Sequence, residues 1–265
     1  MNPAECVSEV IQSVIEKAQV GVNLLDLEKH AEVAMTLRGA TSAVKGYQPA
    51  WAKTPFPSVL CLGVNDAISH AIPINYVLQD GDLLTIDCGL IVDGKAGDAG
   101  LTIPIGTVSD GNERLLRYTK RALYEGIKQI KSGVKVTEIG KAIELYAKKM
   151  GFVVNKNLHG HGIGTQMHEE PSIPHFDIGL EEVKELVNGK TKYTYKERDN
   201  IPTLQEGQVL CIEPHLTYKD FIGVRDSDGW TIRTRDKRNS AFMEEMVRVT
   251  SLGYEVLTHI GGDIN

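Results

Sequence analysis

Two aspartates, Asp87 and Asp98, are spaced so that both could act on one ligand. Apolar and β-branched residues flank Asp93-Gly94, a pair that strongly favours a two-residue hairpin turn. Such a turn places Asp87 opposite Gly100, with Asp98 on the same face and diagonal to Asp87. Two carboxylates held together away from water need a cation or a proton to offset their repulsion. The alternative is that both are solvated on an exposed face of the hairpin.

The second half of the chain carries three further candidates beside predicted strands. His161 lies among glycines in HGHGIG, where the backbone can approach a ligand closely. Glu213 ends an apolar run, and Glu244 lies inside a β-like run. Alternation puts Glu245 on the opposite face from Glu244, so we expect Glu245 to be solvated. Taken singly, each candidate is also compatible with a structural or solvated role.

Together, these four carboxylates and one imidazole have the composition of a site for two divalent cations. Oxygen-rich ligation with a single histidine favours harder ions such as Mn, Fe(II) or Co, with Zn as a further option. Two neighbouring ions can deprotonate a shared water and polarise a carbonyl group. The residue types therefore indicate metal-assisted hydrolysis.

The overall composition is that of an ordinary globular chain and argues against several functional classes. The 265 residues carry a net charge of −6 without basic blocks, so nucleic-acid binding has no electrostatic support. The four cysteines are scattered without a C-x-x-C pair, which favours reduced buried thiols over a disulfide framework. We find no secretory signal and no stretch that could span a membrane, and we therefore expect a cytoplasmic protein.

The elements that must position these residues form a repeat. Hydrophobic periodicity predicts four helices, at residues 5–19, 24–38, 115–130 and 137–150. The two helix pairs correspond at an offset of 112 residues, which matches Gly21 with Gly133, Lys29 with Lys141 and Gly39 with Gly151. We interpret residues 1–265 as one domain of two similar halves, with a site drawing ligands from both. The alternative is a coincidence between two amphipathic helix pairs.

A charged segment at about residues 177–202 lacks this periodicity and predicts a surface insertion. Its patterns indicate a short helix near residues 180–186 and a strand near residues 192–195. We expect the segment to lie outside the catalytic core.

Five motifs follow one another along the chain: NDAISHAIP, DCG with GDAGLT, GHGIG followed by HEEP, IEP, and SAFMEE. This set resembles the type I methionine aminopeptidases, and the resemblance runs through nearly the whole chain. It implies an α/β (α+β) pita-bread fold, two pseudo-symmetric halves with a central antiparallel sheet covered by helices. It also implies a metallo-exopeptidase that removes N-terminal methionine when the second residue is small. In such enzymes a metal-bridging hydroxide attacks the first peptide bond.

The resemblance assigns a metal-binding role to five residues. Asp87 would bind one ion, while Asp98 and Glu244 would bridge both. His161 and Glu213 would complete the second ion's ligands. The two ions would be Co, Mn, Fe(II) or Zn.

Substrate contacts follow from the same resemblance. His70 and His168 would contact the substrate and the tetrahedral intermediate, and Glu213 would also handle the proton of the attacking water. Three residues, Cys61, Met167 and Trp230, would line the pocket for the methionine side chain. Plain core packing is the alternative for these three.

The implied partners are the N-termini of nascent polypeptides, which the protein would bind at the ribosome. We expect a monomer that contacts neither membranes nor nucleic acids.

Some residues depart from the family pattern. Leu158 and Met167 replace aromatic residues, and Glu245 stands where a histidine is common. These departures concern pocket shape and substrate preference. The alternatives are an Xaa-Pro aminopeptidase or dipeptidase of the same fold, and a non-catalytic binding homologue.

Overall fold

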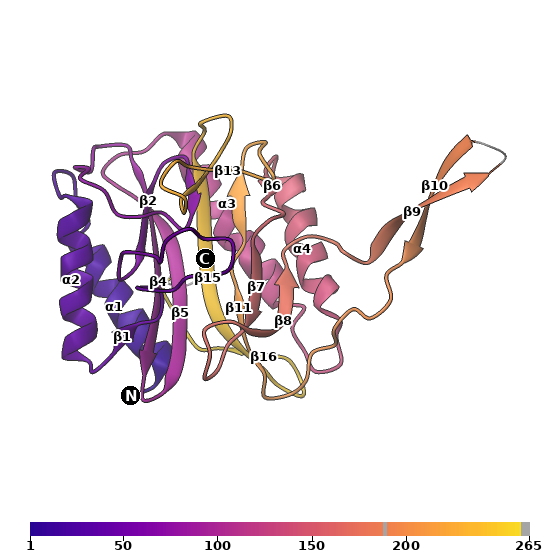
Figure 1. The fold of residues 1–265 in the computed structure, drawn as a ribbon, viewed down its shortest axis with the longest axis horizontal. Helices are drawn as coiled ribbons and strands as arrows, with labels where there is room; N and C mark the ends of the chain where they lie inside the picture. The colour runs from indigo at the N-terminus through magenta and orange to yellow at the C-terminus, as the bar shows by residue number, and fades with distance from the viewer. Residues whose placement is uncertain (188–189, 261–265) are drawn as a thin grey trace.

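A long antiparallel sheet forms the centre of the protein, as the computed structural model shows for residues 1–187 and 190–260 (Figure 1). Its main path runs β1 (Thr41–Ser42), β4 (Leu83–Val92), β5 (Lys95–Pro104), β15 (Ser240–Val249), β11 (Val209–Ile212), β7 (His159–Gly162) and β8 (Glu169–Pro174). Four short strands branch from this path: β2 (Cys61–Val64), β6 (Val153–Val154), β12 (His215–Thr217) and β16 (Tyr254–Val256). A small second sheet joins β3 (Ala67–Ser69), β14 (Ile232–Arg233) and β13 (Val224–Arg225).

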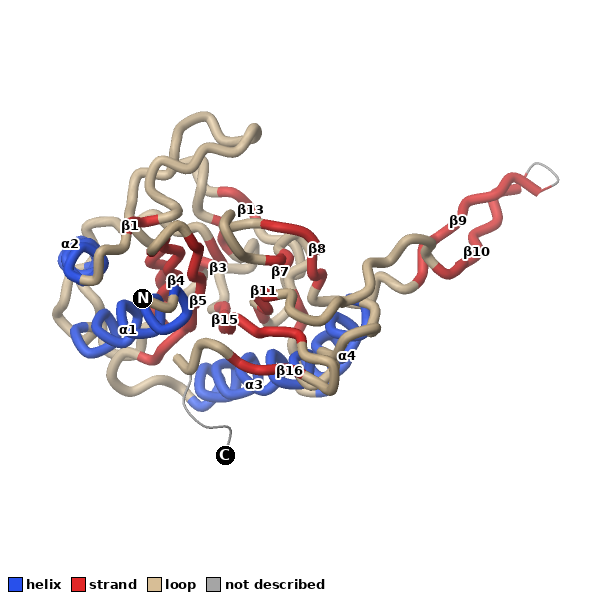
Figure 2. Tube along the Cα trace, turned by 90° about the horizontal axis from the view of Figure 1, so that it is seen from below, coloured by secondary structure: helices blue, strands red, loops and turns tan. Residues whose placement is uncertain are grey.

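In the described ranges, four helices accompany the sheet, close to the predicted positions. They are α1 (Pro3–Lys17), α2 (Leu24–Leu37), α3 (Asp110–Ile127) and α4 (Val136–Lys149). The helices α1, α3 and α4 lie along one side of the sheet, and long loops gather on the other (Figure 2). Side chains at Asn2, Asn23 and Ser109 accept hydrogen bonds from first-turn amides and so fix three of the helix starts. None of the helices in the described ranges is long and apolar enough to cross a bilayer.

The predicted repeat is visible in the backbone. Gly21 and Gly133 each turn the chain with positive φ, of 90° and 87°, a conformation that glycine adopts without strain. Gly21 N–H donates to Leu78 at 2.9 Å, and Gly133 N–H donates to Leu204 at 2.8 Å. The bridges Asn23–Val77 and Lys135–Thr203 follow in each half. The matching connections confirm two similar halves, which meet where β5 pairs with β15.

The hairpin β4–β5 has the predicted turn and register. Asp93 and Gly94 both have positive φ, of 49° and 73°, as a two-residue turn of this kind requires. Asp87 consequently pairs with Gly100, and Asp98 pairs with Gly89. Asp98 is only 4% exposed and Asp87 is half-buried, so the alternative of two solvated aspartates on an exposed hairpin face is wrong.

The charged segment forms a second hairpin that projects from the body of the molecule, β9 (Leu180–Val187) paired with β10 (Lys190–Glu197) (Figure 1). The expected strand lies within β10, but the helix expected near residues 180–186 is wrong because that stretch is β9. Its residues pair one for one with β10, from Leu180 opposite Glu197 to Val187 opposite Lys190. Pairing with a neighbouring strand outweighs a local helical pattern in a short segment.

Candidate metal centre

Sheet register brings the five predicted ligands to one place from five different segments. Asp87 on β4 and Glu244 on β15 both pair with Gly100 of β5, so they flank a residue without a side chain. Asp98 lies two residues from Gly100 and therefore on the same face. In the neighbouring strands, His161 of β7 pairs with Cys211 of β11. Glu213 follows β11 directly, two residues beyond Cys211.

The ligand atoms lie at distances that suit a shared cation. One ligand atom from each of Asp98, His161, Cys211 and Glu244 lies within 4.8 Å of the others, and all four residues are buried. His161 Nε2 is 3.7 Å from Asp98 Oδ2 and 3.5 Å from Glu213 Oε1. Among the described residues, Asp98 Oδ1 and Glu244 Oε1 are buried without a hydrogen-bond partner. Buried oxygens of this kind are costly unless an ion or a proton occupies the space between them.

Electrostatics point the same way. Burial raises the pKa of Asp87 to about 6, although a hydrogen bond with the Cys61 thiol works against the shift. Burial and repulsion from Asp87 hold the pKa of Asp98 well above its usual value. The pKa values of Glu213 and Glu244 are likewise raised by burial and by the neighbouring carboxylates. Four carboxylates that repel one another in a largely buried site fit divalent cations, which would restore their charged forms.

His161 is oriented for ligation. Its Nδ1 lies 2.9 Å from the carbonyl oxygen of Gly162, so Nδ1 carries the proton and Nε2 presents a lone pair to the carboxylates. Burial, with a contribution from His168, lowers the pKa of His161 to about 4, which keeps the ring neutral at pH 7. A neutral imidazole with a free lone pair is the form that binds metal.

A cavity of about 240 Å³ opens above the carboxylates. All ten residues singled out from the sequence line it: Cys61, His70, Asp87, Asp98, His161, Met167, His168, Glu213, Trp230 and Glu244. The two histidines outside the cluster differ in exposure. His70 is largely enclosed, and burial, Arg225 and His168 lower its pKa to about 4. His168 is exposed, with its ring centroid 4.5 Å from that of His161.

The wall of the cavity beside β2 and β4 is apolar. Cys61 and Trp230 are buried and pack with Phe56, whose ring lies edge-on to Trp230 at 5.1 Å. Trp230 Nε1 donates to the carbonyl oxygen of Thr54 at 3.1 Å, so the indole is fixed. Opposite, a Cβ at Gly89 would come 2.2 Å from Met167 Cε, so the glycine makes room for that thioether.

Sequence reasoning missed two groups at the carboxylate cluster. Cys211 was treated as an ordinary buried thiol, but its Sγ belongs to the cluster and its pKa is raised well above the usual value by burial and by Glu244. His175 is fully buried, and its Nε2 accepts a hydrogen bond from the backbone N–H of Glu213 at 3.1 Å. This bond holds the backbone of Glu213 in place. The pairing of Cys211 with His161 depends on register between distant strands, which no local pattern reveals.

Glu245 was wrongly expected to be solvated. Its side chain is fully buried on the opposite face of β15 from Glu244. Thr258 donates a hydrogen bond to Glu245, and the Tyr124 hydroxyl lies 3.4 Å from its Oε1. Alternation gave the correct face, but α3 covers that face instead of water.

The fold has close relatives of known structure and sequence. The metallopeptidase family M24 matches residues 2–251. The methionine aminopeptidase of Aquifex aeolicus is 36% identical over 258 residues, which cover 97% of this chain and 93% of that protein. The crystal structure of methionine aminopeptidase from Rickettsia prowazekii matches with a TM-score of 0.84 at 28% identity. The match covers 97% of this chain and 94% of the Rickettsia chain.

A prolidase from Pyrococcus furiosus is more distant, with a TM-score of 0.69 and 19% identity. The match covers 99% of this chain but only 62% of the prolidase chain, and at this identity it shows the fold alone.

The fold and the buried donor set define a metallopeptidase with the pita-bread architecture. The chain belongs to metallopeptidase family M24. Its carboxylates and histidine fit divalent metal binding, and the two unpartnered oxygens at Asp98 and Glu244 are consistent with it.

Proposed function

We propose that this protein is a methionine aminopeptidase, which hydrolyses the first peptide bond of polypeptides that begin with methionine followed by a small residue. One observation carries the proposal: an apolar wall of Cys61, Phe56 and Trp230 adjoins the buried carboxylate cluster within a single cavity. A thioether side chain on that wall would bring the first peptide bond to the cluster. The curated relatives named methionine aminopeptidase support the same activity.

Two divalent ions, of Co, Mn, Fe(II) or Zn, would be held by the five predicted ligands. Asp87 would bind one ion and Asp98 and Glu244 would bridge the pair. His161 and Glu213 would complete the second. When bound, such ions lower the pKa of water and polarise the scissile carbonyl.

The chain's own residues supply positioning and proton handling. Glu213 accepts the proton of the attacking water and delivers it to the departing amine, because its carboxylate lines the cavity beside the cluster. His168 is exposed to the cavity and donates to the developing oxyanion. His70 contacts the peptide group on the side of the cavity next to Trp51.

The proposal extends to the setting of the reaction. Nascent polypeptides at the ribosome supply the substrate, and the protein acts as a cytoplasmic monomer. Residues 1–265 form one catalytic domain, with the hairpin β9–β10 as a surface insertion.

The Xaa-Pro peptidase alternative is less well supported. The prolidase match shows the fold alone and leaves more than a third of that chain uncovered. The alternative of a non-catalytic binding homologue is disfavoured because all five expected ligands are present and line one cavity.

Turnover of synthetic peptides tests the proposal. We expect the metal-loaded protein to release methionine from Met-Ala-Ser, to lose activity with a chelator, and to recover it with Mn, Co or Fe(II). Met-Leu-Ser tests the preference for a small second residue. Ala-Pro-Ser tests for the Xaa-Pro peptidase activity found in the same fold. Preference for Ala-Pro-Ser would replace the proposal with an Xaa-Pro peptidase, and inactivity with all three would favour the binding homologue.

A further inference from the structure

At the mouth of the cavity lies a loop of which only Phe56, in the apolar wall, has an assigned part in the reaction. Residues 46–56 form this loop, and its two ends are held together because Gly46 N–H donates to Phe56 at 2.8 Å and Phe56 N–H donates to Tyr47 at 2.9 Å. A turn at its tip, closed by the Ala52 N–H, carries Trp51. The base is therefore fixed, and the turn presents Trp51 at a defined place.

Trp51 lies between His70 and Trp230, which belongs to the apolar wall. Its ring centroid lies 5.0 Å from that of Trp230, edge to face, and 6.4 Å from that of His70, nearly parallel at 24°. The side chain lines the cavity yet is 49% exposed. About half of the surface of Trp51 is therefore open to whatever enters the cavity.

A cation supports the indole. The guanidinium carbon of Arg225 lies 3.8 Å from the centroid of the Trp51 ring, well within the range of a cation–π contact. Arg225 Nη1 also donates to the carbonyl oxygens of Gly229 and Trp230, at 3.2 and 3.5 Å. Trp51 is thus coupled to the segment that carries Trp230.

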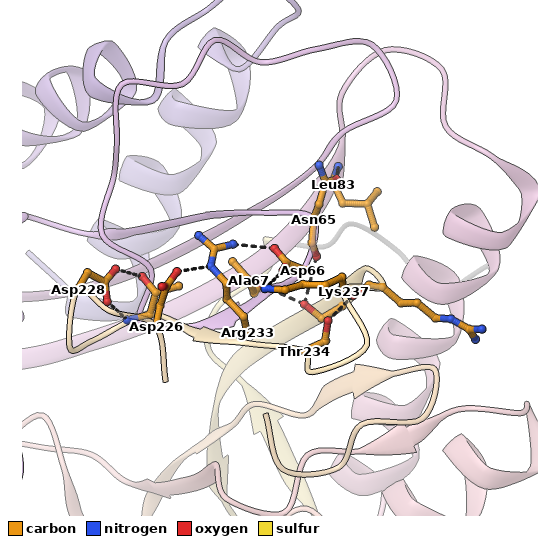
Figure 3. A network of polar contacts seen from close by, with 12 residues as sticks. Asn65, Asp66, Ala67, Leu83, Asp226, Asp228, Arg233, Thr234 and Lys237 are labelled. Atoms are coloured by element: carbon orange, nitrogen blue, oxygen red, sulfur yellow. Dashed lines mark hydrogen bonds and ion pairs between the residues drawn. The ribbon is translucent and has the colours of Figure 1, made fainter. Parts of the chain in front are cut away.

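That segment is itself anchored to the N-terminal half by a network of ion pairs (Figure 3). Arg233 lies between two aspartates, with Nη1 2.6 Å from Asp66 Oδ1 and Nε 2.5 Å from Asp226 Oδ2. Lys237 Nζ adds a contact with Asp66 at 3.3 Å. Because Asp226 immediately follows Arg225, the network holds Arg225 in place.

We propose that Trp51, supported by Arg225, is the wall that limits the size of the second residue of the substrate. This inference rests on the proposed function. The methionine side chain lies against the wall of Cys61, Phe56 and Trp230, and the scissile peptide lies at His70. The following residue must then pass the His70 ring toward the rim, where Trp51 stacks against that ring. An indole there leaves room for a small side chain and excludes a branched or long one.

Cleavage of a peptide series by metal-loaded variants tests the inference. We expect Trp51→Ala to raise the kcat/KM of Met-Val-Ser and Met-Leu-Ser relative to Met-Ala-Ser by about 10-fold or more, the usual effect of reshaping a pocket by a few methylenes. Trp51→Phe keeps a ring and should keep most of the discrimination. Arg225→Ala should shift the ratio in the same direction as Trp51→Ala, but less. Inhibition by free methionine, which has no second residue, should be unchanged in all three variants.

Tyr254→Ala provides a matched control, because this exposed aromatic residue on β16 is not among the cavity's lining residues. An unchanged peptide ratio in an active Trp51→Ala variant overturns the inference alone, as does an equal loss on all three peptides. Failure of the wild-type protein to release methionine from any of them overturns the proposed function as well.

Discussion

Asp98 and Glu244 illustrate how a single buried atom can indicate a ligand. Each keeps one carboxylate oxygen without a hydrogen-bond partner in the described part of the chain. Their side chains are only 4% and 2% exposed, so water cannot compensate fully. The two oxygens therefore mark the place where a cation would be most strongly held.

His161 and His168 should fail differently when replaced by alanine. His161 Nε2 faces Asp98 and Glu213, so His161→Ala should weaken binding of one ion, and excess metal should partly restore activity. His168→Ala should retain both ions and lower kcat and kcat/KM together, by about 10²- to 10³-fold, as loss of an oxyanion donor does. Titration of metal into each variant during turnover measures the difference. Rescue of His168→Ala but not His161→Ala would reverse the two roles.

Individual elements differ in how much of them the sequence could predict. The hairpin β4–β5 was predictable to the register because Asp93-Gly94 specifies its turn, and every pairing then follows. The motifs that carry the five proposed ligands were recognisable because each of them lies in a short segment. Trp51 and Cys211 were not, since their neighbours come from distant segments. The same holds for Glu245, whose burial depends on α3, and for β9, where strand pairing replaced a local helical pattern.

The hairpin β9–β10 should be dispensable for catalysis. Its base is closed by the Arg198 N–H, which donates to Gly179 at 2.9 Å, so residues 180–197 can be replaced by a short Gly/Ser linker. Loop length affects stability only weakly. We expect the kcat/KM for a tripeptide to stay within a few-fold of the wild-type value. A large fall in kcat would mean that the hairpin shapes the cavity.

One carboxylate, Asp220, organises the segment between β12 and β15, which includes β13 and β14. Burial opposes its ionisation, but hydrogen bonds from the side chain and backbone of Arg235 and from the amides of Gly223 and Ile222 outweigh this and lower its pKa to about 2. Because the folded-state pKa lies below the usual value of about 4, the stabilisation is complete above that pH and is lost as pH falls through about 2.

Asp220→Asn should therefore lower the free energy of unfolding at pH 7 by about 1–2 kcal/mol. The difference from wild type should shrink as the pH is lowered toward 2. Urea unfolding of both proteins across this range provides the measurement. Asp236→Asn is the control, because its ion pair with Arg238 is long, at 3.9 Å, and an asparagine can still accept the Arg238 N–H that donates to Asp236 Oδ1 at 3.1 Å. An equal effect of the Asp220 substitution at every pH would show that its charge is not responsible.

The whole molecule depends on contacts between its halves. The repeat was predictable because helix periodicity and turn glycines are local signals, and Gly21 and Gly133 carry out the same backbone turn. The pairing of β5 with β15 could not be predicted from local signals, since it joins residues more than a hundred positions apart. The carboxylates brought together there repel one another unless cations are bound.

Metal should consequently stabilise the entire fold. A divalent ion at 100 times its Kd adds about 2.7 kcal/mol, which corresponds to a rise in Tm of about 5–10 °C for a chain of this size. Calorimetry with a chelator and with added Mn or Co measures the shift. In Asp98→Asn the added metal should raise Tm much less, whereas Glu206→Ala, at an exposed site, should respond like wild type. An identical Tm with and without metal in the wild-type protein would contradict the assignment of these carboxylates as ligands.

The position of β15 has a consequence for biosynthesis. This strand lies between β5 and β11 in the centre of the sheet, yet both of those neighbours precede it in the chain (Figure 1). A chain that emerges from the ribosome N-terminus first must therefore keep a gap in its sheet until residues 240–249 appear. Glu244 arrives with that strand. Each newly made molecule thus passes through a stage in which both helix pairs have been synthesised but the proposed ligand set is incomplete, and the strand that closes the sheet also supplies the last member of that set.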